Sequence, residues 1–167
     1  MTAIVYTTNT GSTERYAKML GEKTGCGVYE LSKCEALKNS EIIYFGWVMA
    51  GTVQGLSQAR EKFGKLKAVV AVGMMPGEKS KQETAEKNAI TEPFFYLPGA
   101  FSVKKLRGMY KMMMSMMLRM MKSKVKESGD PDDKRALELF ENGFDSVKEE
   151  NLAPVEEFLK QCYNINN

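Results

Sequence analysis

The chain has 167 residues, of which 43% are hydrophobic and 27% are charged, and its formal net charge is +3. This length predicts a single domain over residues 1–167, and the apolar content is enough for an ordinary core, which excludes a chain that is disordered throughout. Three scattered cysteines and the absence of histidine exclude a disulfide framework, the usual zinc sites and histidine-based catalysis. We therefore expect no metal site and no catalytic side chain, with any chemistry carried by a bound cofactor.

The N-terminus carries no recognisable targeting signal. Met1–Thr7 lacks both the basic part and the long apolar part of a secretory signal. No uninterrupted apolar stretch is long enough to span a bilayer. The sequence therefore predicts a cytoplasmic protein.

Short β-branched runs alternate with segments of helical periodicity along the chain. We predict strands at 3–7, 27–31, 41–46, 67–73 and 93–97. We predict helices at 13–23, 56–63, 80–88, 103–126 and 134–142, a loop at 128–133, and a last helix that opens at 151–154. The runs lack polar alternation, which is typical of strands buried on both faces, and strands that alternate with helices indicate an α/β fold with a parallel sheet.

Residues Thr8–Thr13 join the first predicted strand to the first predicted helix. Hydroxyl groups on Thr8, Thr10, Ser12 and Thr13 can donate to phosphate oxygens, and a glycine lets the backbone approach an anion closely. No lysine or arginine lies in this segment, which suits a phosphate monoester better than a triphosphate. Taken alone, the segment is equally compatible with a polar turn that caps the helix.

The spacing Thr8-x-Thr10-Gly11-x-Thr13 matches in full the phosphate loop [ST]-x-T-G-x-T, so the chain resembles the flavodoxin family. The resemblance implies a flavodoxin-like three-layer sandwich whose five-stranded parallel sheet has the order 2-1-3-4-5. It also implies a flavoprotein that binds FMN and acts in electron transfer. By this resemblance, the FMN phosphate is held by Thr8, Asn9, Thr10, Gly11, Ser12 and Thr13.

The same resemblance implies two loops around the flavin ring, one after the third strand and one after the fourth. The first loop is Gly46–Thr52, and its expected ring contacts are Gly46, Trp47, Val48, Met49, Ala50 and Gly51. The second loop is Gly73–Gly77, with expected contacts Gly73, Met74, Met75 and Pro76. Aromatic and apolar side chains can cover the isoalloxazine, and glycines expose backbone groups to its polar edge. The alternative for Trp47 is an ordinary core residue.

The segment Lys104–Lys126 carries eight basic residues and no acidic one. Its periodicity predicts one apolar helix face made of Leu106, Met109, Tyr110, Met113, Met117, Met120 and Met121. A core helix that covers the sheet is one interpretation. The wide apolar arc and the uniformly basic charge also indicate peripheral contact with the inner face of a membrane, or binding of a partner. We expect no nucleic-acid binding, because the basic stripe is narrow and the rest of the chain is acidic.

A second resemblance concerns the later part of the chain. Gly99-Ala100, followed by Lys104–Arg107 and the methionine-rich run, resembles the flavodoxin-fold, quinone-dependent protoporphyrinogen dehydrogenases, and so does Lys79–Thr84. This resemblance implies that the basic methionine-rich helix is an addition after the fifth strand. Three functions stay open. The first is an electron carrier that serves a redox partner protein, and the second is an FMN-dependent oxidoreductase that passes electrons to a quinone at the membrane. The third is a non-redox interaction module that keeps the fold without FMN.

Overall fold

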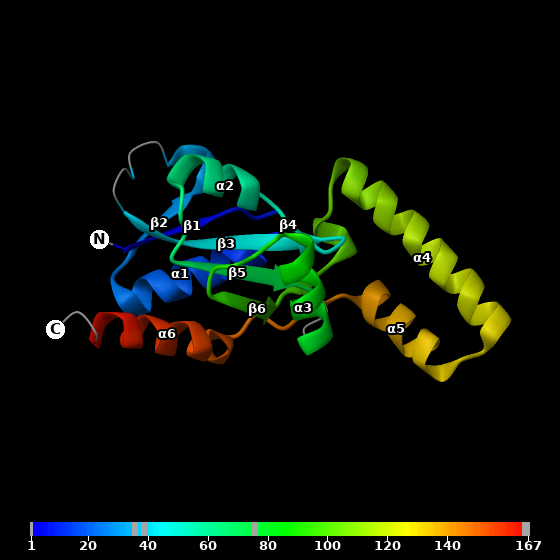
Figure 1. The fold of residues 1–167 in the computed structure, drawn as a ribbon. Coiled ribbons are helices and arrows are strands. Elements are labelled where there is room, and N and C mark those ends of the chain that lie inside the picture. The colour runs from blue at the N-terminus through cyan, green and yellow to red at the C-terminus, as the bar shows by residue number, and fades with distance from the viewer. Residues whose placement is uncertain (1, 35–36, 38–39, 75–76, 165–167) are drawn as a thin grey trace. The chain divides into compact units, whose positions relative to one another are not determined.

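The fold is described from a computed structural model, which describes residues 2–34, 37, 40–74 and 77–164 (Figure 1). The chain forms two compact units. Unit 1 comprises Met1–Gly99 and Val147–Asn167, and unit 2 comprises Ala100–Ser146. Whether 1–167 behaves as one domain stays a prediction.

Unit 1 contains the strands and helices of an α/β fold. Its strands are β1 (Thr2–Tyr6), β2 (Gly27–Glu30), β3 (Glu41–Met49), β4 (Thr52–Val53), β5 (Ala68–Gly73) and β6 (Phe94–Pro98). Its helices are α1 (Ser12–Thr24), α2 (Leu56–Phe63), α3 (Glu78–Lys87) and α6 (Ala153–Asn164), with short 3-10 turns η1 (Leu31–Lys33) and η3 (Glu149–Leu152). These elements confirm the predicted alternation of strands and helices.

The main sheet of unit 1 has the strand order β2-β1-β3-β5-β6. All four neighbouring pairs are parallel, and β4 adds to β3 in the antiparallel direction. If only the five parallel strands are numbered, the order becomes 2-1-3-4-5, which is typical of doubly wound sheets. The direction in which successive strands are added reverses between β1 and β3. In such sheets, ligands bind at the carboxyl ends of the strands beside that reversal.

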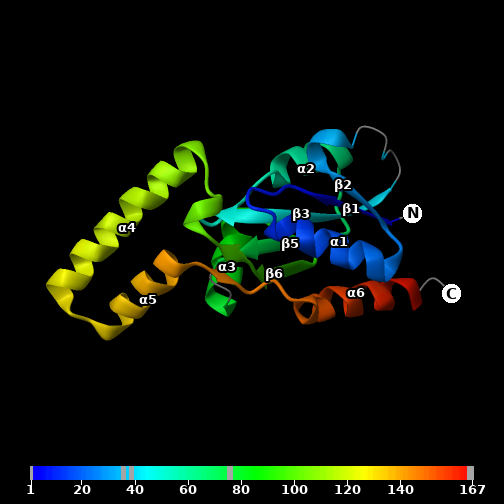
Figure 2. The ribbon, with the colours of Figure 1, turned by 180° about the vertical axis from the view of Figure 1, so that it is seen from behind.

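The sheet is covered by helices on both faces (Figures 1 and 2). One face packs with α2, in a core cluster that includes Val5, Tyr44, Leu56 and Val69. Alternate strand residues point the other way, toward α1 and α6. A contact between Phe95 of β6 and Phe158 of α6, with ring centroids 5.7 Å apart, belongs to that second layer.

The three cysteines are all free thiols. Cys34 is buried, and burial raises the pKa of its thiol. A thiol with a raised pKa is a poor nucleophile at neutral pH, so Cys34 has the character of a structural residue.

Unit 2 is a small strand pair that carries two helices. It contains β7 (Ala100–Phe101), the 3-10 turn η2 (Val103–Lys105), α4 (Gly108–Ser128), α5 (Pro131–Asn142) and β8 (Phe144–Asp145). Three aromatic rings, Phe101, Phe140 and Phe144, pack together at its base with centroids 5.4 to 6.5 Å apart. The prediction of a loop through 128–133 is wrong in its second half, because Pro131 starts α5 and proline is well suited to a first helical turn.

The prediction of one apolar face on the methionine-rich helix is also wrong. The half-buried apolar residues of α4 are Tyr110, Met114, Met117, Leu118, Met121 and Val125. Five other methionines are exposed, and no residue of α4 is buried. The helix packs on α5 within unit 2. No helix among the described residues is long and apolar enough to cross a membrane.

Candidate functional site

The segment Thr8–Thr13 lies between the end of β1 and the first turn of α1, as predicted. Gly11 occupies the N-cap position with φ of +95°, a conformation that glycine adopts without strain. Its N–H donates to the Thr8 hydroxyl at 3.1 Å, which folds the segment back on itself. Because the N-cap residue is a glycine, no side chain caps α1 from that position, whereas the Thr8 hydroxyl does form the polar turn of the alternative interpretation.

The hydroxyl of Thr13 is the unusual group in this segment. Thr13 is 1% exposed, and its Oγ1 is a buried side-chain oxygen with no hydrogen-bond partner among the described residues. An unpaired buried hydroxyl costs about 1–3 kcal/mol. It lies in the first turn of α1, where helix N–H groups lack intrahelical acceptors and the helix dipole favours an anion. The position therefore has an unused donor at a helix end that favours an anion.

Space for a ligand exists beside Gly11. A Cβ built on Gly11 would meet no atom within 4 Å. The backbone is thus open at the point where an anion would approach it. The neutral hydroxyl and N–H donors of the segment suit the phosphate group of a mononucleotide, so these residues fit the cofactor implied by the sequence pattern.

A partly buried triad of Thr7, Tyr44 and Gln54 joins the base of this segment to the chain that follows β4. Thr7 Oγ1 and the Tyr44 hydroxyl lie 2.9 Å apart, and both donate to the carbonyl of Gln54, at 2.9 and 2.6 Å. Burial raises the pKa of Tyr44, so its proton stays in place to donate. The triad therefore fixes the end of β1 against the residues that lead into α2.

The predicted first ring loop, Gly46–Thr52, is not a loop over most of its length. Gly46–Met49 continue β3, and Val48 and Met49 pair with Val53 and Thr52 of β4. The turn consists of Ala50 and Gly51, whose φ values of 48° and 76° are typical of a type I′ hairpin turn. The apolar side chains before the turn favour strand extension, and this outweighs the loop tendency of the flanking glycines.

The end of α3 holds this hairpin in place. Lys87 Nζ donates to the Ala50 carbonyl at 2.6 Å. The Asn88 amide donates to the Gly51 carbonyl at 2.8 Å and accepts from the Val53 N–H at 3.0 Å. Nothing in the sequence pattern marks Asn88 for this role, because an asparagine that follows a helix is common for other reasons.

We expect Asn88→Ala to lower the free energy of unfolding by about 2 kcal/mol. The substitution removes the side-chain hydrogen bonds to the Gly51 and Thr84 carbonyls and leaves the buried Val53 N–H without an acceptor. Urea denaturation measures the change. Asn142→Ala is the control, since Asn142 is exposed, and it should change stability by less than about 0.5 kcal/mol. Equal effects of the two substitutions would contradict the assigned role of Asn88.

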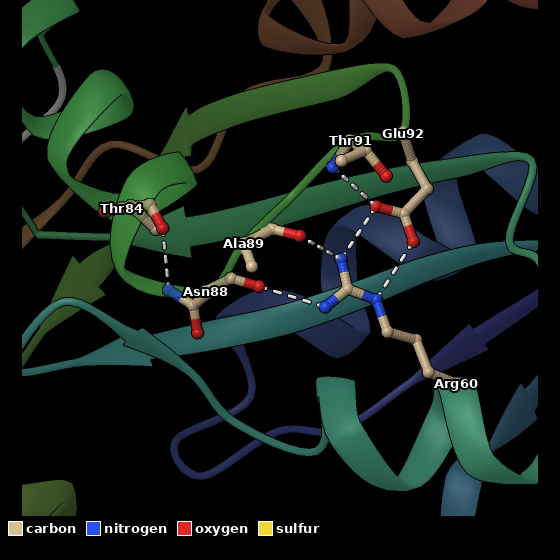
Figure 3. A network of polar contacts seen from close by, with 6 residues as sticks. All are labelled: Arg60, Thr84, Asn88, Ala89, Thr91 and Glu92. Carbon is tan, nitrogen blue, oxygen red and sulfur yellow. Dashed lines mark hydrogen bonds and ion pairs between the residues drawn. The ribbon is translucent and has the colours of Figure 1, made fainter.

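Arg60 of α2 fixes the chain at Asn88 and just after it (Figure 3). Its guanidinium donates to the carbonyls of Asn88 and Ala89 at 3.0 and 3.1 Å. It also makes a two-pronged contact with the Glu92 carboxylate, at 3.0 and 2.7 Å. The Thr91 N–H donates to the same carboxylate at 3.0 Å. Arg60 therefore positions the asparagine that holds the hairpin.

This contact makes part of the stability depend on pH. Arg60 holds the pKa of Glu92 below its ordinary value of 4.5. The unfolded chain therefore takes up a proton at a higher pH than the folded chain, and the stabilisation is present above about pH 4.5 and lost as the pH falls through the folded-state pKa. We expect the stability difference between the natural protein and Glu92→Gln to shrink between about pH 6 and pH 3. A difference that stays constant in urea titrations would contradict this assignment.

The third predicted segment follows β5, next to β3 in the sheet. Gly73 is the last residue of β5 and Met74 follows it half-buried, whereas Met75 and Pro76 lie outside the described residues. A Cβ on Gly73 would overlap the hydroxyl end of the Tyr96 side chain, so any larger residue there would have to displace Tyr96. The Gly73 carbonyl accepts from the Gly99 N–H at 2.7 Å, which ties this strand end to the end of β6.

Trp47 is half-buried near the carboxyl end of β3, in register with Val72 of β5. The strands β1, β3 and β5 are neighbours and run parallel, so the segments that follow them emerge at one edge of the sheet. The structure therefore brings Thr8–Thr13, the Gly46–Gly51 hairpin and Gly73–Met74 to the same edge.

No protein-family model matches the chain, and no curated protein is significantly similar to it. Among solved structures, the chain is similar to one titled "Structure of a flavodoxin from the domain Archaea". The two share 19% sequence identity with a TM-score of 0.40, and the match covers 63% of this chain and 88% of that chain. The fold assignment above rests on the strand order of unit 1 itself.

Proposed function

We propose that the chain is an FMN-binding, flavodoxin-like redox protein that acts in electron transfer. The observation that carries this proposal is the buried, unpaired Thr13 hydroxyl in the first turn of α1. That turn follows β1, at the point where the strand order reverses. A phosphate oxygen at this position would accept the hydroxyl proton and complete its hydrogen bonding.

In this proposal, the phosphate is held by Thr8, Asn9, Thr10, Gly11, Ser12 and Thr13. Gly11 supports this role because its positive φ exposes the backbone and the space beside it is open. The absence of a basic side chain from the segment favours a single phosphate group held by hydrogen bonds. The threonine and serine hydroxyls would donate hydrogen bonds to the phosphate oxygens and would keep their protons.

The flavin ring would lie at the same sheet edge, between the hairpin and the end of β5. Its proposed contacts are Gly46, Trp47, Val48, Met49, Ala50, Gly51, Gly73, Met74, Met75 and Pro76. When bound, FMN would supply the electron-transfer chemistry. The chain would contribute orientation, because the hairpin is held by Asn88 and the base of the phosphate segment by the Tyr44 hydroxyl.

The proposed partner is a redox protein or a quinone, and the proposed location is the cytoplasm. The site residues include no paired acid and base, which agrees with electron transfer through the cofactor. Oxidation of a porphyrinogen by a quinone-dependent enzyme stays a prediction from resemblance.

The test is a titration of the purified chain with FMN and, separately, with riboflavin. We expect FMN to bind more tightly than riboflavin, because only FMN carries the phosphate group. Trp47, the only tryptophan, should lose fluorescence as either flavin binds. A chain that takes up no FMN, or that does not distinguish FMN from riboflavin, would overturn the proposal.

A further inference from the structure

Five exposed methionines form one continuous line along α4. Their exposed fractions are 63% for Met109, 69% for Met112, 47% for Met113, 63% for Met116 and 67% for Met120. The spacing i, i+3, i+4, i+7 and i+11 places them on one side of the helix. We name this set the methionine ridge. Its exposure is unusual, because soluble proteins rarely leave a continuous apolar stripe open to water.

The ridge is separate from the apolar face that packs within unit 2. The half-buried face of α4 contains Tyr110, Met114, Met117 and Met121, and the helix packs there on α5. Figures 1 and 2 show α4 and α5 as a helical hairpin. The structure thus gives α4 two apolar faces, and only one of them is covered.

The basic residues of this segment also fall into two groups. Lys122 and Lys124 are paired with acidic residues of α5, at 2.6 Å from Glu141 and 2.9 Å from Asp133. The other basic residues are exposed and make no ion pair with any described residue: Lys104, Lys105, Arg107, Lys111, Arg119 and Lys126. The charges that support the helical hairpin are therefore distinct from those that stay free.

The free cations lie next to the ridge. Arg119 is three residues from Met116 and seven from Met112, so it lies directly beside the ridge, and the exposed Lys126 lies seven residues further on along the same side. Lys104, Lys105 and Arg107 come just before the helix begins. No acidic residue occurs between Lys104 and Lys126, so an anionic surface would meet no repulsion along this length.

We propose that the methionine ridge and its free cations dock the protein on an anionic lipid membrane. The ridge projects from a single helix and is convex, so it suits a deformable medium that closes around it. Unbranched methionine side chains adapt to acyl chains, and long basic side chains reach back to the headgroups. The helix would lie in the plane of the interface with its methionines below the headgroups.

The test is sedimentation of the full chain with vesicles of phosphatidylcholine alone and of phosphatidylcholine mixed with phosphatidylglycerol. We expect binding to the mixed vesicles only, weakened by salt. Met112→Gln/Met116→Gln removes ridge area with little change in helix propensity, and Arg119→Gln/Lys126→Gln removes two free cations beside the ridge. Each double variant should bind at least about tenfold more weakly.

The matched control is Lys65→Gln/Lys79→Gln, which removes two exposed cations of unit 1. It should bind like the natural protein. Met116→Trp supplies a second readout, because its emission should shift to shorter wavelength with the mixed vesicles alone. The proposal is overturned if the chain ignores both vesicles, if it binds them equally, if the control loses as much binding as the α4 variants, or if the ridge proves to bind an acidic protein and no lipid.

Discussion

Replacing Thr13 with valine is expected to weaken FMN binding by roughly 10–100-fold, because a hydrogen bond to a charged group contributes about 1.5–3 kcal/mol. Valine keeps the β-branched shape and removes only the hydroxyl. Since that hydroxyl has no partner among the residues that the structure describes, its removal should also stabilise the FMN-free protein, by about 1 kcal/mol. Binding is measured by flavin fluorescence and stability by urea denaturation.

Riboflavin and Thr24→Val give this prediction its controls. Riboflavin lacks the phosphate, so Thr13→Val should leave its affinity unchanged. The Thr24 hydroxyl, at the other end of α1, donates to the Leu20 carbonyl at 2.7 Å. Its removal should therefore lower stability and leave FMN affinity unchanged. If Thr13→Val bound FMN as tightly as the natural protein, the Thr13 hydroxyl would not hold the phosphate.

Replacing Gly55 with alanine is expected to lower the free energy of unfolding by about 4 kcal/mol. Gly55 has φ of +79°, and the added Cβ would lie 2.3 Å from the Tyr44 hydroxyl and 2.7 Å from Thr7 Cγ2. A positive φ costs an L residue about 1–2 kcal/mol, and forced overpacking costs about 1–3 kcal/mol. Neither neighbour can move easily, because both are bonded to the Gln54 carbonyl.

Gly25→Ala separates the two contributions. Gly25 has φ of +69°, and a Cβ there would meet no atom within 4 Å. Gly25→Ala should therefore lower the free energy of unfolding only by the cost of the positive φ, about 1 kcal/mol. Gly55→Ala should in addition weaken FMN binding, because it displaces Thr7, which leads into the phosphate segment. Equal destabilisation by both substitutions would show that the contacts of Gly55 with Tyr44 and Thr7 do not constrain the fold.

The sheet could be predicted from the sequence because its signals are local. A run such as Ala68–Gly73 is apolar without alternation, and all of these runs except 27–31 are followed by a helical period. These two features define buried parallel strands, and the structure confirms burial for β1, β3 and β5. The prediction of burial on both faces is wrong for the edge strands β2 and β6, which are partly exposed. The strand β4 was not predicted, because a two-residue strand leaves no period to detect and depends on its pairing with Val48 and Met49.

The covered face of α4 could not be predicted, and the reason is physical. Apolar residues occupy more than half of the helix circumference, so periodicity alone does not select one face. The selection comes from α5, whose Asp133 and Glu141 pair with Lys124 and Lys122. Those contacts join residues 9 and 19 positions apart in the sequence, and the helical period carries no information about them.

The sequence pattern identified the residues of the candidate site. It did not identify the residues that hold the site in place. Thr8–Thr13 matches a pattern of small polar residues that can be found by inspection. The role of Asn88 depends on a chain reversal that brings the end of α3 to Ala50 and Gly51. The Tyr44 hydroxyl likewise acts on residues far from it in sequence, Thr7 and Gln54. Only the folded chain shows these contacts.

The most direct test of the proposed FMN site is an amide NMR spectrum of the ¹⁵N-labelled chain during titration with FMN and with riboflavin. The site predicts that FMN shifts the amide signals of Gly11, Ser12 and Thr13 most strongly, together with those of Trp47 and Met74. Riboflavin should shift the second group and leave the first unchanged. FMN binding that leaves the amides of Gly11–Thr13 unmoved would contradict the account.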